Sequence, residues 1–324
     1  MTTELSNEAK WQRDTLEKLV LTAFQEQRRQ RRWNIFFKLV FLSIFLGLIG
    51  ILWFKPFRMF GRANHSQHIG IIDIRGTISA SSPTNADNII ISLQNAFRNS
   101  HTAAIVLRIN SPGGSAVQAG QIYDEIQYQR RKNPNKSIFT VCEDVCASAA
   151  YYIASATDQI YANPASIVGS IGVRMDGFGF VESLKKLGIE RRVLVSGQHK
   201  LLLDPFQPLQ PEAQQIAQDM LSDVHQQFIE AVKIGRGKRL KDENEKEKQL
   251  FSGLAWTGKQ ALPLGLIDGL SNLDQLTREV IKLRTFVNYT RRPSPLQKLM
   301  EMFSASLMQQ INALLSPTLQ SHAR

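Results

Sequence analysis

An apolar run near the N-terminus constrains this chain most strongly. The run extends from Trp33 to Phe54 and contains one charged residue, Lys38. A helix over these residues is about 33 Å long at 1.5 Å per residue, which matches a bilayer core of about 30 Å. Trp33 and Trp53 lie near its two ends, where aromatic residues commonly meet the membrane interface. The run therefore predicts one N-terminal transmembrane helix over residues 33–54, in preference to a buried core helix.

Basic residues flank this run unequally. Four arginines within residues 28–32 directly precede it, and they outweigh the three basic residues within 55–62. The positive-inside rule then places residues 1–32 in the cytoplasm and the rest of the chain on the outer, periplasmic or extracytoplasmic side of the plasma (inner) membrane. A cleaved signal peptide is the alternative, but the long polar segment ahead of the run favours an uncleaved single-pass anchor.

The same distribution of charge bears on the partners of the chain. Its net charge is +11 and its pI about 9.7, values that suit either nucleic acid or an anionic membrane surface. The arginines gather beside the apolar run, and the sequence has no RNA-binding signature or zinc-finger spacing. We therefore expect a membrane partner and no nucleic acid.

The chain divides into five segments by composition. We expect a cytoplasmic segment over 1–32, the transmembrane helix over 33–54, a linker over 55–67, a folded domain over 68–292 and an amphipathic tail over 293–324. The apolar residues of the tail recur at helical spacing, which suits a membrane-surface helix, an oligomer contact or packing on the domain.

Strand-like and helix-like patterns alternate through the domain. Predicted strands cover 68–75, 104–109, 137–142, 159–162, 168–173 and 192–195. Predicted helices cover 86–97, 116–131, a segment from about 148, 181–187, 211–233, 257–264 and 273–283. Strands separated by helices predict an α/β fold with a mostly parallel sheet.

The segment Asn110–Ser115, of sequence NSPGGS, lies where a predicted strand gives way to a helix. Gly113 and Gly114 allow the backbone to approach a ligand closely, and N–H groups at the helix start face developing negative charge. This arrangement suits an oxyanion hole, although a phosphate or a thioester carbonyl would also fit.

Ser148 occupies a second predicted strand-to-helix junction, where it is either a nucleophile or a helix N-cap. A nucleophilic serine needs a base, and none of the six histidines has an obvious partner acid. Lys200, in the segment SGQHK after a predicted strand, is the alternative base. A lysine accepts a proton only when burial or a neighbouring positive charge lowers its pKa.

Five motifs in order carry a resemblance to a known family. They are NSPGGS at 110–115, ASAAYYIA at 147–154, GSIGV at 169–173, SGQHK at 196–200 and WTGKQA at 256–261. Together they resemble the signal peptide peptidase A family, peptidase family S49, in its short single-repeat form. The resemblance covers about residues 68–292 and implies a ClpP/crotonase-like α/β fold. It also implies Ser148 as nucleophile, Lys200 as base, and Gly113 and Gly114 in the oxyanion hole.

The resemblance carries further expectations. It implies that the Ser170 hydroxyl holds the lysine amine, and that the protein forms homo-oligomeric rings in which nucleophile and base can come from one protomer or from two neighbouring ones. The implied reaction is hydrolysis of signal peptides and other membrane-derived peptides, without a metal or organic cofactor. The family commonly has Ser-Gly-Gly at the nucleophile, whereas Ala149 and Ala150 follow Ser148 here.

Two other functions stay open at the level of sequence. A crotonase-like acyl-CoA enzyme would share the fold and the glycine turn, but it would not need a Ser–Lys pair or an anchor. A catalytically idle scaffold of the same family is compatible with the Ala149–Ala150 departure. Two cysteines, Cys142 and Cys146, are too few for a disulfide framework, and we expect two buried thiols.

Overall fold

The structure is a computed structural model that describes residues 28–47, 49–50, 66–241 and 249–291. The chain forms two compact units, Met1–His65 and Ser66–Arg324. In the first unit residues 28–47 and 49–50 are helical. No helix among the described residues is both long and apolar enough to cross a membrane. Part of the predicted span 33–54 and the whole predicted tail 293–324 lie outside the described residues.

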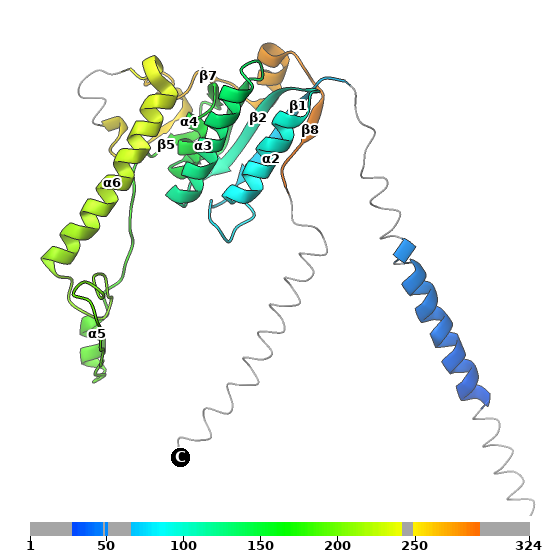
Figure 1. The fold of residues 1–324 in the computed structure, drawn as a ribbon, viewed down its shortest axis with the longest axis horizontal. Coiled ribbons are helices and arrows are strands. Elements are labelled where there is room, and N and C mark those ends of the chain that lie inside the picture. Colours follow the sequence, from blue (N-terminus) through cyan, green and yellow to red (C-terminus); the bar gives the residue numbers. More distant parts are fainter. Residues whose placement is uncertain (1–27, 48, 51–65, 242–248, 292–324) are drawn as a thin grey trace, which may run out of the picture. The chain divides into compact units, whose positions relative to one another are not determined.

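The second unit is built on one eight-stranded sheet (Figure 1). The strand order is β6-β5-β3-β2-β1-β8, with β4 pairing with β3 and β7. Every pair is parallel except β5 with β6, so the predicted mostly parallel α/β sheet is confirmed. The strands are β1 His68–Arg75, β2 Thr102–Ser111, β3 Ile138–Ala147, β4 Gln159–Ala162, β5 Ile167–Gly169, β6 Ala255–Thr257, β7 Gly269–Leu270 and β8 Phe286–Asn288.

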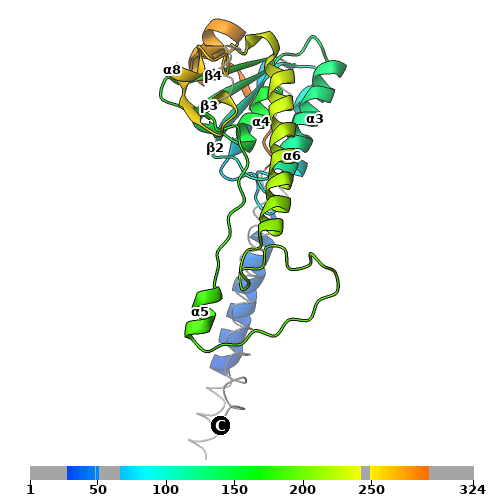
Figure 2. The same cartoon turned by 90° about the vertical axis from the view of Figure 1, so that its left-hand side faces the viewer.

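Helices cover one face of this sheet and form the main core with it (Figure 2). Side-chain caps mark the start of helices here: Asn85 Oδ1 accepts the Asn88 N–H, and Ser115 Oγ accepts the Gln118 N–H. The helices are α2 Ala86–Arg98, α3 Ala116–Lys132, α4 Ala149–Ser155, α5 Val181–Lys186, α6 Pro211–Arg236, α8 Gly258–Ala261 and α9 Leu273–Leu276, with a π-helical turn over Thr277–Ile281. On the other face, Leu276 of α9 packs in a smaller apolar cluster.

A bulge in β3 directs the chain toward Ser148. On β2, Ile109 is paired with Cys142 and Ser111 with Cys146, so β3 has two more residues than its partner over this stretch. The first half of β3 pairs with β4 and the second half with β5. The bulge therefore moves the end of β3 from one neighbour to another. Cys142 and Cys146 flank the bulge as buried free thiols, which confirms the expectation of two buried thiols.

Residues 174–210, which we call the extended segment, leave the body of the domain (Figures 1 and 2). The predicted strand 192–195 falls in this segment and is wrong, because those residues are exposed and pair with no strand among the described residues. The predicted strand 168–173 ends at Gly169, since the backbone turns into positive φ at Gly169 and Ser170. The helix α5 buries none of its residues.

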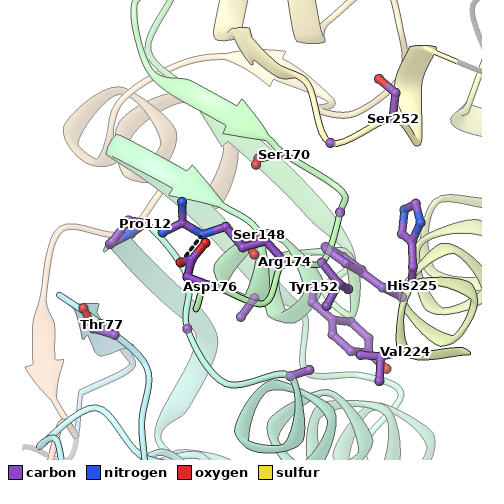
Figure 3. A pocket seen from close by; sticks show the side chains of 18 residues that line it. Thr77, Pro112, Ser148, Tyr152, Ser170, Arg174, Asp176, Val224, His225 and Ser252 are labelled. Atoms are coloured by element: carbon purple, nitrogen blue, oxygen red, sulfur yellow. Dashed lines mark ion pairs between the residues drawn. The ribbon is translucent and has the colours of Figure 1, made fainter. Parts of the chain in front are cut away.

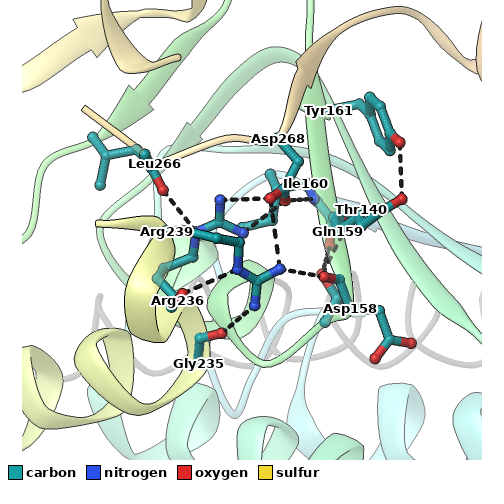
Figure 4. A network of polar contacts seen from close by, with 12 residues as sticks. Thr140, Asp158, Gln159, Ile160, Tyr161, Gly235, Arg236, Arg239, Leu266 and Asp268 are labelled. Carbon is teal, nitrogen blue, oxygen red and sulfur yellow. Dashed lines mark hydrogen bonds and ion pairs between the residues drawn. The ribbon is translucent and has the colours of Figure 1, made fainter. Parts of the chain in front are cut away.

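A buried arginine fixes the end of α6 to the sheet (Figure 4). Arg236 is 1% exposed and donates to both Asp268 carboxylate oxygens, at 2.7 and 3.0 Å, and to the Gly265 carbonyl at 2.9 Å. Asp268 also accepts the Ile160 N–H of β4 at 2.7 Å. One ion pair therefore connects α6, β4 and the turn before β7, and it sets where α6 runs past the sheet.

Candidate active site

Ser148 lies at the junction of β3 and α4 in a strained backbone conformation. Its φ of 53° and ψ of −128° are sparsely populated by non-glycine residues. Such a conformation costs about 1–3 kcal/mol and persists where the surrounding structure holds it. The Ser148 N–H donates to the Gly169 carbonyl at 2.8 Å, and its own carbonyl accepts the Tyr152 N–H at 3.0 Å. Ser148 occupies the N-cap position of α4, but its side chain forms no cap hydrogen bond and is therefore not used for capping.

The glycine turn packs directly against this junction. A Cβ added to Gly113 would lie 2.7 Å from Ser148 Cβ and 2.9 Å from the Ala149 nitrogen. The φ of Gly113 is +104°, which also favours glycine. The Gly113 N–H donates to Ser111 Oγ at 3.1 Å. The missing side chain of Gly113 thus lets the glycine turn lie against Ser148. The Gly113 N–H is already bonded within the turn.

The next glycine, Gly114, pairs with Ile78. Ile78 forms a parallel bridge with Gly114: the Ile78 N–H donates to the Gly113 carbonyl at 2.9 Å, and the Ser115 N–H donates to the Ile78 carbonyl at 2.8 Å. Both hydrogen bonds use the neighbours of Gly114, so the N–H and carbonyl of Gly114 itself point away from Ile78. No hydrogen bond occupies the Gly114 N–H among the described residues.

These elements surround a cavity of about 820 Å³ (Figure 3). Sequence-predicted site residues Gly113, Gly114, Ser148 and Ser170 all line it. The structure therefore brings four of the five predicted residues to one place. The other lining residues are Thr77, Pro112, Ala116, Ala149, Tyr152, Gly172, Val173, Arg174, Asp176, Val224, His225, Phe228, Ser252 and Gly253.

Aromatic residues form one wall of the cavity. Tyr152 is one turn after Ser148 on α4, and its ring stacks on Phe228 of α6 with centroids 4.9 Å apart. Burial raises the pKa of Tyr152, so its hydroxyl stays neutral. Sequence analysis missed Tyr152, Phe228 and His225 as site residues. The helical periodicity of α6 marked its apolar face, but no sequence pattern showed that this face meets Ser148.

The two alanines after Ser148 have different surroundings. Ala149 lines the cavity, whereas Ala150 is fully buried in the main core. The extra methyl of Ala150 therefore adds packing contacts away from the cavity, and only the methyl of Ala149 narrows it.

Lys200 is not brought to this cavity within one chain. It lies in the extended segment, exposed to solvent, and its N–H closes a turn by donating to the Gly197 carbonyl at 3.1 Å. None of the described residues that line the cavity is a lysine. The basic residues at the wall are Arg174, which pairs with Asp176 at 3.4 Å, and His225.

Several known proteins that are similar to this chain are named as proteases. A protein named Na(+)/H(+) antiporter NhaA from Brucella abortus is 46% identical over 187 residues, which cover 58% of this chain and 25% of that protein. Protease 4 from Haemophilus influenzae is 30% identical over 259 residues, covering 79% of this chain and 40% of that protein. The chain therefore spans less than half the length of both relatives. A solved structure of a membrane-bound stomatin-specific protease covers 71% of this chain and 99% of that one, with 17% identity and a TM-score of 0.42.

The family match covers the central part of the chain. Residues 130–286 match the model of peptidase family S49. The matched region contains Ser148, Ser170 and Lys200, and it begins after the glycine turn. By this match, residues 130–286 are similar to peptidase family S49, over just under half of the chain.

Proposed function

We propose that this protein is a serine endopeptidase in which Ser148 is the nucleophile and Lys200 is the general base. The observation that carries the proposal is the strained conformation of Ser148 beside an open cavity and the glycine turn. Backbone strain of this kind clusters at active sites, and Ser148 and Ser170, which both line the cavity, both have it.

The oxyanion of the reaction is stabilised by backbone donors. The Gly114 N–H points away from Ile78 and lines the cavity. The Ala149 N–H is the first of α4, where N–H groups have no partner within the helix. We assign both as oxyanion donors, with Gly113 giving the close approach; one such donor typically contributes about 3 kcal/mol.

Lys200 reaches the cavity from a neighbouring copy of the chain. Support comes from its position in the extended segment, whose large apolar side chains are widely exposed, Leu194 at 100% and Phe178 at 80%. Exposed apolar surface of this extent marks a protein contact. A homo-oligomeric ring would bury the segment and carry each Lys200 into the next cavity, where Ser170 Oγ would hold its amine.

The reaction then proceeds by acyl transfer. Neutral Lys200 Nζ accepts the Ser148 proton as Ser148 Oγ attacks a peptide carbonyl, and the oxyanion forms at the backbone donors. Protonated Lys200 gives its proton to the leaving amine, and water hydrolyses the acyl-enzyme. The residues in these roles need no metal or organic cofactor. The substrates that we propose are signal peptides and other membrane-derived peptides, because apolar and aromatic side chains form one wall of the cavity.

A fluorophosphonate probe tests the nucleophile on the full chain in detergent. We expect one adduct, located on Ser148 by mass spectrometry, that is absent from Ser148→Ala and strongly reduced in Lys200→Ala. Ser222→Ala, which removes an exposed serine of α6, serves as the matched control and keeps the adduct. An assembled wild-type protein that forms no adduct would contradict the proposal and favour the scaffold or the acyl-CoA enzyme.

We also propose that residues 33–54 anchor the domain to the plasma membrane, with residues 1–32 cytoplasmic. The apolar run and the arginines before it support this topology. Protease added to intact spheroplasts should digest the domain and spare a tag at the N-terminus. Protection of the domain, with digestion only after lysis, would reverse the proposed orientation.

A further inference from the structure

His225 of α6 lines the cavity, as does the loop that contains Ser252 (Figure 3). Its Nε2 lies 3.1 Å from the carbonyl oxygen of Ile171. A carbonyl only accepts hydrogen bonds, so Nε2 is the protonated nitrogen and donates. This bond joins α6 to Ile171, the residue that follows Ser170. Neither the family resemblance nor a sequence pattern singled out His225.

The turn at Ser170 needs external support. Ser170 has a φ of 52°, a left-handed conformation that non-glycine residues rarely adopt. On one side, the Ser170 N–H donates to the Leu254 carbonyl at 2.9 Å, and a Cβ on Gly172 would lie 2.9 Å from Gly253 Cα. On the α6 side, the bond from His225 to Ile171 is the support. The turn is thus held between the loop over 252–254 and α6.

The position of α6 is itself fixed. Arg236, near its end, is bound to Asp268 and to the Gly265 carbonyl, and Phe228 packs on Tyr152 one turn after His225. A histidine on a fixed helix holds the Ile171 carbonyl at one place, which a mobile loop side chain would not do. The conformation of Ser170 is therefore linked through Ile171 to the helix that covers the core.

We propose that His225 is a positioning residue for the peptidase reaction. Its hydrogen bond to Ile171 fixes the Ser170 turn, so that Ser170 Oγ meets the incoming lysine amine in one orientation. The inference rests on the proposed function, in which Ser170 holds the Lys200 amine while Lys200 accepts the Ser148 proton. His225 itself contacts neither the reacting atoms nor the lysine in this role.

The test compares donors at position 225 in the full chain. His225→Leu removes the donor, and we expect Ser148 acylation by a fluorophosphonate and kcat on a peptide to fall about tenfold, the effect of a typical buried hydrogen bond, with KM nearly unchanged. In His225→Gln a side-chain amide can donate to Ile171, and most of the rate should return. Gln226→Leu, at the neighbouring exposed position of α6, controls for the change in helix composition.

A double-mutant cycle with Ser170→Ala separates positioning from general damage to the fold. If His225 acts through Ser170, adding His225→Leu to Ser170→Ala should slow acylation no further. Thermal unfolding checks assembly, and His225→Met, which also lacks a donor, replaces His225→Leu if the latter does not assemble. Equal losses in the Leu and Gln variants, or additive losses in the cycle, would overturn the proposal. A wild-type protein that is never acylated would instead refute the proposed function.

Discussion

At the scale of single residues, Gly113 determines whether the backbone beside Ser148 can keep its conformation. Gly113→Ala places a methyl 2.7 Å from Ser148 Cβ at a φ of +104°. Because backbone atoms surround this position on the Ser148 side, the new methyl must displace the junction. We expect Gly113→Ala to abolish the Ser148 adduct and to lower the free energy of unfolding by about 2 kcal/mol, measured by urea denaturation.

Gly120, in the middle of α3, is the matched control for this substitution. A Cβ there meets nothing within 4 Å, and its backbone is helical. Gly120→Ala should raise the free energy of unfolding by about 0.5–1 kcal/mol and leave the adduct intact. If Gly113→Ala were acylated normally, the contact between residue 113 and Ser148 would not need a glycine.

Cys146, two residues before Ser148, gives a prediction about alkaline pH. Burial raises the pKa of Cys146 above its usual value of 9.0, and the neighbouring Cys142 raises it further. Between the unfolded and folded values the folded protein holds one more proton, so stability falls as pH rises through this range. The free energy of unfolding should decline above pH 9 in the wild type and decline less in Cys146→Ala. If the free energy of unfolding fell equally with pH in both proteins, the fall would not come from Cys146.

At the scale of elements, the Arg236–Asp268 pair holds α6 against the sheet. Removing one partner of a buried ion pair costs about 3–5 kcal/mol, and Asp268 would keep Arg239 at 3.5 Å as a partner, which places the loss at the lower end of this range. We expect Arg236→Met to lower the free energy of unfolding by about that amount in urea denaturation. It should also slow Ser148 acylation, because α6 carries His225 and Phe228 to the cavity.

Arg278→Met is the control for this loss. Arg278 pairs with Glu279 in the same unit, but both side chains are more than half exposed. Exposed pairs contribute about 0–1 kcal/mol, so this variant should unfold close to the wild type. Equal stability of the two variants would mean that α6 does not depend on the buried pair.

The elements also show how far sequence reasoning extends. The elements from β1 to α4 have strong apolar patterns and turn signals, and their order was predicted. The strands β6, β7 and β8 have two or three residues each and were missed, because so short a segment has no periodicity to detect. Residues 192–195 have a β-branched pattern without a sheet edge to pair with, since local propensity does not specify a partner.

The candidate site divides in the same way. Ser148 and Gly113 were singled out because each lies at a predicted strand-to-helix junction, and the resemblance to a known family implied their roles. His225 was missed because its role depends on one hydrogen bond to a residue 54 positions away. A bond of this kind follows from the packing of α6, and nothing in the local sequence of α6 specifies it.

At the scale of the whole molecule, the extended segment separates Lys200 from the cavity of its own chain. The segment has its own contacts: Phe180 packs on Phe206 with ring centroids 5.5 Å apart, and Arg191 lies over the Phe206 ring. Several of its other apolar side chains, Leu194 and Phe178 among them, are exposed. Under the proposed mechanism, the described part of one chain holds Ser148 apart from Lys200 and leaves this apolar surface exposed, and one neighbouring copy would supply the lysine and cover the surface.

Mixing two inactive variants tests this arrangement. Ser148→Ala supplies Lys200, and Lys200→Ala supplies Ser148, so a site shared between copies becomes complete where the two meet in the right order. In a ring assembled at random from equal amounts, about one site in four is complete, because each position carries its required variant half of the time. Co-expression of the two variants should therefore restore about a quarter of the wild-type peptidase activity. The same variants mixed as preformed rings stay inactive unless subunits exchange. Co-expressed rings that contain both variants, by mass spectrometry, and yet show no activity would place Ser148 and its base in the same chain.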